Sequence, residues 1–442
     1  MMEKAVQNDK VVAEGTRIYD TYKDSGVEWL GDIPEHWEVK RFKHIFREKK
    51  ITHNVELNCG SISFGKVVYK DNEKVPVSTK KSYQVLNRGE FLINPLNLNY
   101  DLISLRIALS DKDVVVSSGY IIVQNVAELS KSYYKWLLHI FDIAFMKTLG
   151  SGVRQTLSFT HVANSELVFP PLSEQTKIAE FLDDKTTKIE AAIAIKEQQI
   201  NLLKERKQII IHKAVTQGLN PNVKLKDSGV EWIGEIPEGW EVKKLKELCK
   251  AFGRIGFRGY TTSDLVSEGE GSITISPSNI KEEFMTFEKC SFLSWKKYEE
   301  SPEIQIFNDD VLIVKTGSTF GKVGIVKDLP QKATINPQLL VLKEIKVNPN
   351  YFYSALKTSM VQIQVQQEVI GSTIPTISET KILNFKIALP PQKEIEELII
   401  YLNDVNYKFQ TAINLKQQEI TKLKEYKSSL INSVVTGKVK VC

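Results

Sequence analysis

The sequence has few of the residues that build metal or disulfide sites. It holds four cysteines, Cys59, Cys249, Cys290 and Cys442, with no CxxC pair and no histidine cluster beside them. Zinc needs closely spaced Cys or His ligands, so a zinc site is not expected. There is also no run of about 18 apolar residues and no apolar stretch near the N-terminus, which argues against a membrane span and a secretory signal. We therefore expect a cytoplasmic protein.

Catalytic motifs are scarce as well. The segment Gly317–Val323 (GSTFGKV) is one residue shorter than a phosphate loop and ends in valine, which offers no hydroxyl to magnesium. The six histidines are scattered and form no HExxH motif, and no GxGxxG follows an expected strand. The two Pro-Pro pairs lack the preceding asparagine of an amino-methyltransferase motif. The sequence therefore predicts a protein that is not itself a catalyst.

The bulk composition is that of a folded protein with several domains. The chain has 442 residues, of which 42% are hydrophobic and 26% charged, and its length suggests about three domains. The net charge is +5, and its distribution is uneven: residues 38–169 hold 18 Lys+Arg against 12 Asp+Glu, a net of +6, whereas residues 172–216 hold 8 against 7. This excess would suit a polyanion, although an ordinary solvated surface explains it equally well.

An internal repeat organises the chain. DSGVEWLGDIPEHWEVK (24–40) and DSGVEWIGEIPEGWEVK (227–243) share 14 of 17 residues at an offset of 203. Downstream, PPLSEQTKIAEFL (170–182) parallels PPQKEIEELIIYL (390–402), at an offset of 220. The order is therefore a cap motif, a variable region and a long helix, followed by the same three again.

The two variable regions share a strand-rich plan. GEFLINP (89–95) parallels DDVLIVK (309–315), and VVVSSGYIIV (114–123) parallels ATINPQLLVL (333–342). Alternating β-branched residues bounded by Gly, Pro and Asn predict strands. We expect an α+β fold with four parts: a first domain with its cap at 18–169, a helix at 170–218, a second cap and domain at 219–389, and a helix at 390–442.

Each long helix carries an apolar stripe with coiled-coil spacing. Pro-Pro suits each helix start, and Gly218 and Gly437 suit the ends. Lys196 and Lys416 interrupt the heptad grids and are expected to fix the register. Because a single helix would expose its stripe to water, we expect the two helices to pair in antiparallel fashion about a pseudo-twofold axis. The residues expected to pair are Leu182, Ile189, Leu203, Ile210, Leu402, Phe409, Leu423 and Leu430.

The cap motif has the appearance of an aromatic clamp. Two tryptophans flank an Ile-Pro pair in each copy. Since buried tryptophan mostly serves packing, we expect each cap to join a variable domain to the helix ends. The members are Trp29, Ile33, Pro34 and Trp37 in the first copy, and Trp232, Ile236, Pro237 and Trp240 in the second.

These features together resemble a known family. The duplicated cap, the duplicated helix and the segments TGSTFGKVG (316–324) and NPLNLNYDL (94–102) are similar to those of the specificity subunit of bacterial type I restriction-modification systems. The resemblance covers nearly the whole chain from about residue 18. It implies two target-recognition domains, each reading one half of a split site in double-stranded DNA, and helices that space them.

The resemblance also implies partners. Two methyltransferase subunits would bind the helices, and two ATP-dependent restriction subunits (translocase–endonucleases) would join them. S-adenosylmethionine, ATP and Mg²⁺ would then belong to those partners and not to this chain.

Candidate DNA-contacting residues were chosen from polar, turn-rich stretches, where each could equally be ordinary loop surface. The run GRIGFRGY (253–260) mixes Arg, Gly and aromatics, and TGSTFGK exposes backbone N–H groups beside Lys322, which suits a phosphate. In the first region the candidates are Lys80, Lys81, Tyr83, Asn97, Asn99, Tyr100, Arg106 and Arg154. In the second they are Arg254, Arg258, Tyr260, Ser278, Asn279, Lys315, Ser318, Thr319 and Lys322.

Two other classes of function stay open at this point. One is a coiled-coil scaffold that joins protein partners without reading DNA. The other is a self-contained modification enzyme, against which the absent methylation motif argues.

Overall fold

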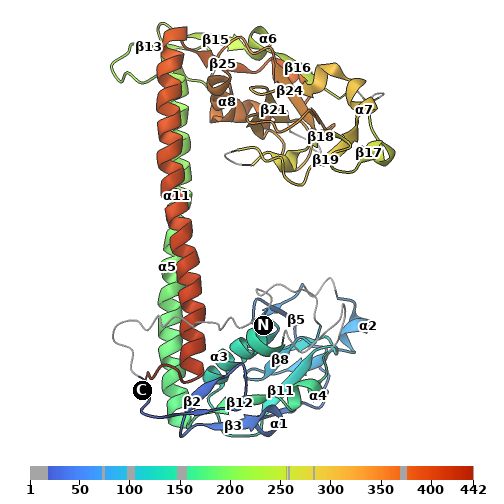
Figure 1. Ribbon diagram of the computed structural model, residues 1–442, viewed down its shortest axis with the longest axis vertical. Helices are drawn as coiled ribbons and strands as arrows, with labels where there is room; N and C mark the ends of the chain where they lie inside the picture. Colours follow the sequence, from blue (N-terminus) through green and yellow to red (C-terminus); the bar gives the residue numbers. More distant parts are fainter. Residues whose placement is uncertain are drawn as a thin grey trace, which may run out of the picture. The chain divides into compact units, whose positions relative to one another are not determined.

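The computed structural model divides the chain into two compact units. It describes residues 18–71, 75–96, 105–146, 157–254, 256, 259–281, 284–368 and 376–441. Unit 1 comprises residues 1–196 and 418–442, and unit 2 comprises residues 197–417 (Figure 1). Each unit therefore takes one strand-rich region together with part of each long helix.

Unit 1 is built around a four-stranded antiparallel sheet of order β4-β11-β8-β9. The pairs β1–β2, β3–β12, β5–β6 and β7–β10 are separate two-stranded sheets. The bounds are β1 Tyr22–Asp24, β2 Asp32–Pro34, β3 Glu38–Arg41, α1 Phe42–Ile45, β4 Phe46–Glu48, β5 Gly60–Ser63, β6 Lys66–Tyr69, α2 Val77–Lys80, β7 Gln84–Leu86, β8 Phe91–Ile93, β9 Ile107–Leu109, β10 Val114–Val116, β11 Ile121–Asn125, α3 Lys131–Phe141, the π-helix η2 Asp142–Met146, α4 Phe159–Ala163 and β12 Glu166–Phe169.

Unit 2 repeats part of this plan and enlarges it. A four-stranded sheet of order β16-β24-β21-β22 is accompanied by a five-stranded sheet of order β17-β19-β18-β23-β20, in which β18 and β23 run parallel. The bounds are β13 Leu225–Asp227, β14 Glu235–Pro237, β15 Glu241–Lys244, α6 Leu245–Leu248, β16 Lys250–Gly253, η4 Thr262–Asp264, β17 Leu265–Val266, β18 Gly271–Ile275, η5 Pro277–Asn279, β19 Ser291–Ser294, α7 Trp295–Glu299, η6 Pro302–Ile304, β20 Gln305–Ile306, β21 Val311–Val314, β22 Val323–Ile325, β23 Ala333–Ile335, β24 Leu339–Lys343, α8 Pro349–Lys357, α9 Ser359–Gln367, α10 Glu379–Leu383 and β25 Lys386–Leu389.

The two long helices follow the two Pro-Pro pairs, and the second ends seven residues before the limit expected at residue 442. Helix α5 spans Leu172–Gln217 and α11 spans Gln392–Val435, each beginning directly after a Pro-Pro pair. Gly218 (φ +74°) follows the first helix, and Gly437 (φ +78°) ends the turn after the second. Both are in the left-handed region, which glycine adopts at little cost. The expected class, strand-rich domains combined with long helices, is confirmed.

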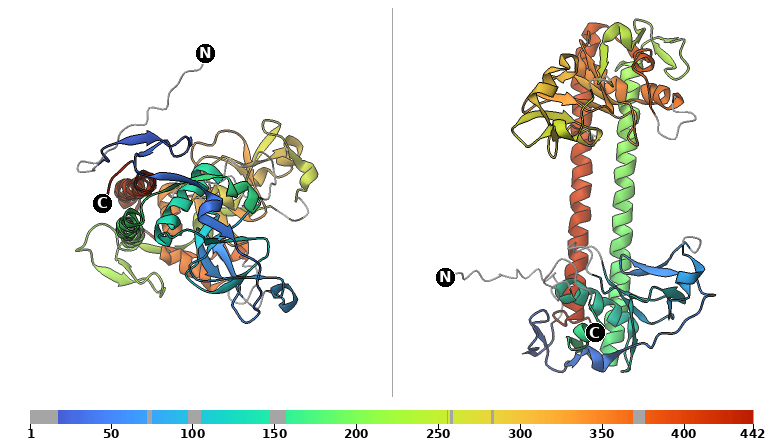
Figure 2. Two further views of the ribbon diagram at one scale, coloured as in Figure 1. Left: turned by 90° about the horizontal axis from the view of Figure 1, so that it is seen from below. Right: turned by 90° about the vertical axis from the view of Figure 1, so that its right-hand side faces the viewer.

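Within each unit the ends of α5 and α11 pack together (Figures 1 and 2). In unit 1, Leu182 and Ile189 of α5 share a hydrophobic core with Ile431 and Val434 of α11. In unit 2, Ile211 of α5 shares a core with Leu402 and Val405 of α11. Since low-numbered residues of α5 meet high-numbered residues of α11, the contacting segments are antiparallel.

Of the residues expected to pair, Leu182, Ile189 and Leu402 belong to these cores, and Ile210, Phe409 and Leu430 pack against them. Leu182, Ile189 and Leu402 are buried, and Leu203, Ile210, Phe409, Leu423 and Leu430 are half-buried. Lys196, which interrupts the apolar grid, forms an ion pair with Glu419 across the helices of unit 1. A second ion pair joins Lys427 to Glu190.

The first cap joins its variable domain to both long helices. The Nε1 of Trp37, which is fully buried, donates to Oε2 of Glu174 in the first turn of α5 (3.0 Å). At the end of α11, a Cβ added to Gly437 would lie 2.4 Å from Cδ of Pro34 and 2.9 Å from the Trp37 ring. The cap therefore contacts the start of α5 and the end of α11, as its aromatic pattern predicted.

The second cap repeats these contacts in unit 2. The Nε1 of Trp240 donates to Oε2 of Glu394 in the first turn of α11 (2.8 Å). A Cβ on Gly218, at the end of α5, would lie 3.2 Å from the Trp240 ring. The sequence alone does not identify Glu174 and Glu394 as partners of the tryptophans. The one feature that the two glutamates share in the sequence is their position in the first helical turn after a Pro-Pro pair.

Candidate nucleic-acid interface

In unit 2 several candidate residues gather around one hollow of about 470 Å³. Its walls come from three turns: the one at η5, the one between β21 and β22, and the one before β24. The lining residues are Ser276, Pro277, Ser278, Ile280, Lys281, Thr316, Gly317, Ser318, Thr319, Lys322 and Gln338. Ser278 is therefore brought together with Ser318, Thr319 and Lys322, although these three lie about 40 residues later in the sequence.

The second turn projects from a rigid strand. All four residues of β21 are buried, and the backbone N–H groups of Phe320 and Lys322 donate to the carbonyls of Gly317 and Thr319 (3.1 and 3.2 Å). Gly317 has a φ of +108°, a conformation that a residue with a side chain would adopt only under strain. This glycine lets the turn present Ser318 and Thr319, both exposed, at the rim of the hollow.

The residues that line the hollow include hydrogen-bonding groups and two cations. Five hydroxyl groups, the ammonium groups of Lys281 and Lys322 and the amide of Gln338 line it, and none of the lining residues is acidic. Neither lysine forms an ion pair with any carboxylate in the part of the chain that the structure describes. Such a lining suits phosphate oxygens and base edges, which offer mostly acceptors.

Asn279 lies beneath this surface and not on it. Its side chain is 2% exposed, and its Oδ1 accepts from the backbone N–H of Ser276 (2.9 Å). The Nδ2 donates to the carbonyl of Glu288 (3.4 Å). The expectation of a DNA contact by this side chain is therefore corrected: the amide holds the η5 turn that carries Ser278.

Arg254 is likewise an interior residue. It is 6% exposed, and its Nε and Nη2 donate to the carbonyl of Ile335 (3.2 Å) and to Oγ1 of Thr334 (3.0 Å). Burial lowers its pKa from the usual value. Its guanidinium also lies 5.2 Å from the ring centre of Tyr260, which is half-buried. A direct groove contact by Arg254 is not compatible with this placement, and Arg258 lies outside the described residues.

Lys315 occupies the end of β21 without lining the hollow. Its backbone N–H donates to the carbonyl of Gln338 (2.8 Å), and its carbonyl accepts from Ile377 (2.9 Å). Its Nζ would be 3.1 Å from a Cβ on Gly253. The backbone of Lys315 therefore connects the turn between β21 and β22 with the turn before β24.

In unit 1 the structure brings three candidates onto one turn. Lys80 ends the short helix α2, Lys81 follows it, and Tyr83 comes two residues later, where its carbonyl lies 2.7 Å from Nδ1 of His53. Lys81 is exposed and the other two are half-buried. Asn97, Asn99, Tyr100 and Arg154 lie outside the described residues.

Arg106 is the clearest departure from expectation in unit 1. It is 5% exposed, and its Nε donates to Oδ1 of Asp142 (3.0 Å) while its backbone N–H donates to Oδ2. Asp142 begins η2 and is fully buried. A buried charge needs such a partner, so this arginine is paired inside the domain and does not reach DNA. Nothing in the sequence indicates that a residue 36 positions later supplies the carboxylate.

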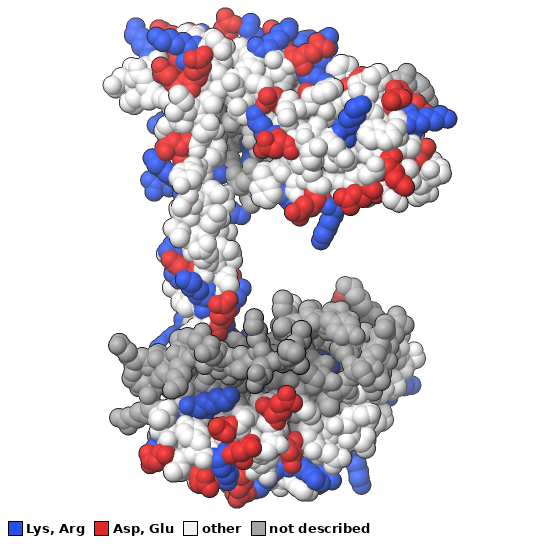
Figure 3. Space-filling model, viewed as in Figure 1, with Lys and Arg blue, Asp and Glu red and all other residues white. Residues whose placement is uncertain are grey.

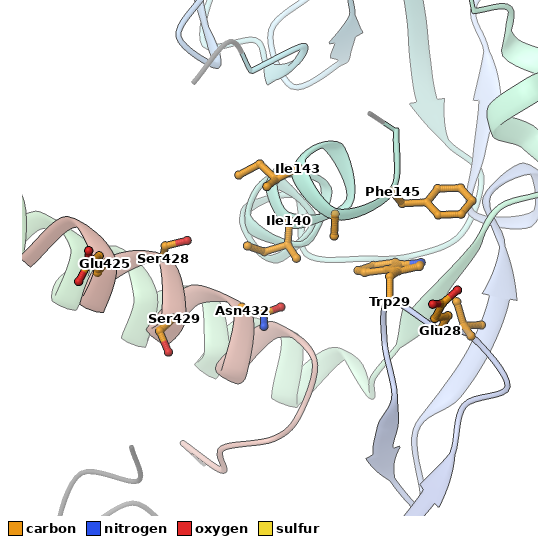
Figure 4. A pocket seen from close by; sticks show the side chains of 11 residues that line it. Glu28, Trp29, Ile140, Ile143, Phe145, Glu425, Ser428, Ser429 and Asn432 are labelled. Atoms are coloured by element: carbon orange, nitrogen blue, oxygen red, sulfur yellow. The ribbon is translucent and has the colours of Figure 1, made fainter. Parts of the chain in front are cut away.

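A second hollow, of about 920 Å³, lies in unit 1, and none of the candidate DNA-contacting residues lines it. Trp29 of the cap, Ile140, Ile143 and Phe145 of α3 and η2, and Ser428 and Asn432 of α11 face it (Figure 4). Its lining is mixed and includes two acidic side chains, Glu28 and Glu425. This character differs from that of the unit 2 hollow and does not suit a polyanion.

The surface charge of unit 2 is mixed on the face seen in Figure 3, where Lys and Arg alternate with Asp and Glu. Among the described residues, no group of three or more His, Cys, Asp or Glu could hold a metal ion. No described helix is long and apolar enough to cross a membrane. Cys59, Cys249 and Cys290 are not joined in disulfide bonds.

The chain combines two strand-rich domains with two long helices. The family model described as "Type I restriction modification DNA specificity domain" matches residues 34–205 and 237–425, that is, both halves of the repeat. The chain belongs to this family.

Known proteins are similar in sequence to nearly the whole chain. The MjaVIII type I restriction enzyme specificity subunit of Methanocaldococcus jannaschii is 24% identical and covers 92% of this chain and 94% of its own. The putative MjaX specificity subunit of the same organism is 25% identical over 93% of this chain and 96% of its own. These relatives are archaeal, so the expectation of a bacterial system stays an expectation.

A solved chain of a type I restriction-modification system has a similar fold. It comes from a structure concerned with complex assembly and conformational transition, and it superimposes with a TM-score of 0.66 at 15% identity. The match covers 91% of this chain and 98% of the solved one. At this identity the likeness concerns the fold alone.

Proposed function

We propose that this chain is the sequence-specific DNA-recognition subunit of a type I restriction-modification complex and performs no catalysis itself. The observation that carries the proposal is the family match over both halves of the chain. The hollow of unit 2, whose lining includes hydrogen-bond donors and no carboxylate, supports it, because phosphate oxygens accept hydrogen bonds and are repelled by carboxylates.

Each variable domain would read one half of a bipartite site in double-stranded DNA. The two domains carry different side chains on related strands, so the half-sites would differ in sequence. In unit 2 the reading surface would be the hollow with Ser278, Ser318, Thr319 and Lys322. In unit 1 it would include the turn of Lys80, Lys81 and Tyr83.

The long helices would form an antiparallel two-helix coiled coil with pseudo-twofold symmetry. The contacts between α5 and α11 within each unit, and the matching Trp–Glu hydrogen bonds of the two caps, support this arrangement. A coiled coil resists bending, so its length would set the number of base pairs between the half-sites.

The same helices would bind two methyltransferase subunits, which two restriction subunits then join. Leu202 and Ile209 of α5 and Ile400 and Tyr407 of α11, all in unit 2, are exposed, with the members of each pair seven residues apart. Apolar residues at heptad spacing on a helix surface suit packing against partner helices. S-adenosylmethionine, ATP and Mg²⁺ would be bound by the partners, and the complex would act in the cytoplasm.

Sequencing of methylated bases in cells with and without this chain tests the proposal. The expected result is one bipartite motif that is modified only when the chain is present. A methylation pattern that does not depend on the chain would contradict the proposal and would favour a scaffold without DNA readout.

A further inference from the structure

One side chain in the unit 2 hollow has a fixed hydrogen-bonding direction. The backbone N–H of Gln338 donates to Oδ1 of Asn336 (3.0 Å). Since this oxygen is used as the acceptor, the other end of the Asn336 amide, Nδ2, is a donor, and it lies 3.2 Å from Oε1 of Gln338. The backbone bond therefore determines both amides, and the Gln338 oxygen is the atom that faces Asn336.

The Gln338 nitrogen faces the turn on the opposite side. A Cβ built on Gly317 would lie 3.2 Å from Nε2 of Gln338, so this nitrogen is close to the Gly317 backbone in the wall of the hollow. The main chain of Gln338 is held as well, because its carbonyl accepts from the N–H of Lys315 (2.8 Å). Gln338 is nevertheless an exposed residue, and it lines the hollow.

This edge offers one donor and one acceptor side by side. Nε2 has two hydrogens, and Oε1 keeps a second lone pair beyond the one that Asn336 uses. In the major groove adenine presents the N7 acceptor and the N6 donor, which match an amide edge. Guanine presents two acceptors, thymine an acceptor and a methyl group, and cytosine a donor. The amide therefore discriminates in favour of adenine.

We propose that Gln338 reads one adenine in the half-site bound by the second variable domain. The proposal rests on the proposed function, since it needs DNA in the hollow. Lys281 and Lys322, which line the same hollow, would contact phosphates and add affinity for every sequence. Asn336 acts as a positioning residue that holds the Gln338 amide in its reading orientation.

The test uses the chain assembled with its methyltransferase partner and a set of duplexes in which each base pair of the recognised site is varied in turn. For Gln338→Ala we expect the preference for adenine at one base pair to fall about tenfold or more, and preferences elsewhere to stay the same. Gln338→Glu, which keeps the shape and removes the donor, is expected to lose the same preference.

Two kinds of control separate reading from general binding. Gln331→Ala, an exposed glutamine that does not line the hollow, is expected to change nothing. Lys281→Ala and Lys322→Ala are expected to weaken all duplexes by a similar factor and to reduce the salt dependence of binding. Melting temperatures of all variants show whether the fold is retained.

The outcomes distinguish this inference from the function it rests on. If the lysine variants weaken all duplexes and Gln338→Ala leaves every base preference intact, the inference is overturned while DNA recognition by this surface stands. A relaxed base pair that contains no adenine would overturn it too. If the lysine variants leave binding unchanged, the hollow does not face DNA, and both the inference and this choice of reading surface fail.

Discussion

The two units treat a cation at the same strand position in opposite ways. Arg106 precedes β9 and Lys322 precedes β22. The carbonyl of Arg106 accepts from Asn94, which follows β8, and the carbonyl of Lys322 accepts from Val314, the last residue of β21. Arg106 is buried against Asp142, whereas Lys322 lines the open hollow. In unit 2 the helix facing this position offers Gln362, which donates to the carbonyl of Gly321 (3.1 Å) and supplies no negative charge.

The comparison indicates that the side chain on the facing helix determines whether such a cation is buried or exposed. A carboxylate on the helix draws the side chain into the core, and an amide leaves it at the surface. The caps are alike in the two units, since each has the Trp–Glu bond and a glycine packed against the cap. The repeat therefore fixes the framework, and single substitutions within it decide which side chains are available to a ligand.

The largest expected effect comes from removing Asp142. Asp142→Ala would leave the buried Arg106 charge without its partner and should destabilise unit 1 by about 3–5 kcal/mol. Hydrogen exchange of peptides from β8, β9 and α3 measures this loss. Lys322→Ala is the matched change in unit 2 and should alter stability by less than about 0.5 kcal/mol. Equal losses of stability in the two variants would show that the burial of Arg106 and the exposure of Lys322 make no energetic difference.

The next largest effect concerns the glycines at the helix ends. Replacing either Gly218 or Gly437 with alanine should lower the free energy of unfolding by about 1 kcal/mol, because alanine is strained in the left-handed backbone conformation. At Gly437 the new Cβ would also overlap Pro34 at 2.4 Å, whereas at Gly218 the nearest atom, in Trp240, is 3.2 Å away. Overpacking adds about 1–3 kcal/mol, so Gly437→Ala should cost more. Denaturant midpoints of the two variants decide this order, and a larger loss for Gly218→Ala would contradict it.

The two caps should also differ, by a smaller amount, in how their contribution to stability depends on pH. Burial raises the pKa of Glu174, but hydrogen bonds from His36, Trp37 and Tyr19 outweigh it and hold the pKa below its usual value. A lowered pKa stabilises the fold fully above the ordinary glutamate pKa of about 4.3, and this contribution is lost as pH falls through the lower pKa of the folded chain.

Unit 2 tests this effect, because Gly239 stands where unit 1 has His36. His36→Gly should reduce the acid-induced loss of stability in unit 1 and leave unit 2 unchanged. Hydrogen exchange near pH 7 and near pH 4 measures both units in one experiment. An undiminished acid response in the variant would show that His36 does not contribute.

The smallest effect is expected from the ion pairs between the helices of unit 1. At the offset of 220, the equivalents of Glu419 and Glu190 in unit 2 are Gln199 and Gln410, so carboxylates are present in one unit only. Glu419→Gln should cost about 0.2–1 kcal/mol because the pair with Lys196 is partly exposed, and less at high salt. Thermal unfolding at two salt concentrations measures the change. A loss independent of salt would point to packing instead of charge.

The sequence predicted the framework better than the site. Pro-Pro pairs, terminal glycines and heptad spacing are local signals, and α5, α11 and the strands β8 and β21 follow them. Arg106 and Arg254 could not be placed from the sequence because their partners, Asp142 and Thr334, are distant in sequence and meet them only in the folded chain. Asn279 has partners nearby in sequence, Ser276 and Glu288, but its burial also arises only in the folded chain. Gln338 was missed for the same reason, since only the approach of the Gly317 turn makes its amide part of a hollow.

Exchange of the first variable region is the most direct test of the central claim that two separate domains read two halves of one site. Residues 38–169 are replaced by the corresponding region of a relative, and methylated motifs are sequenced in cells that carry the exchanged chain. The account predicts that one half of the motif changes and that the other half and the spacing are kept. A change in both halves, or in neither, would contradict it.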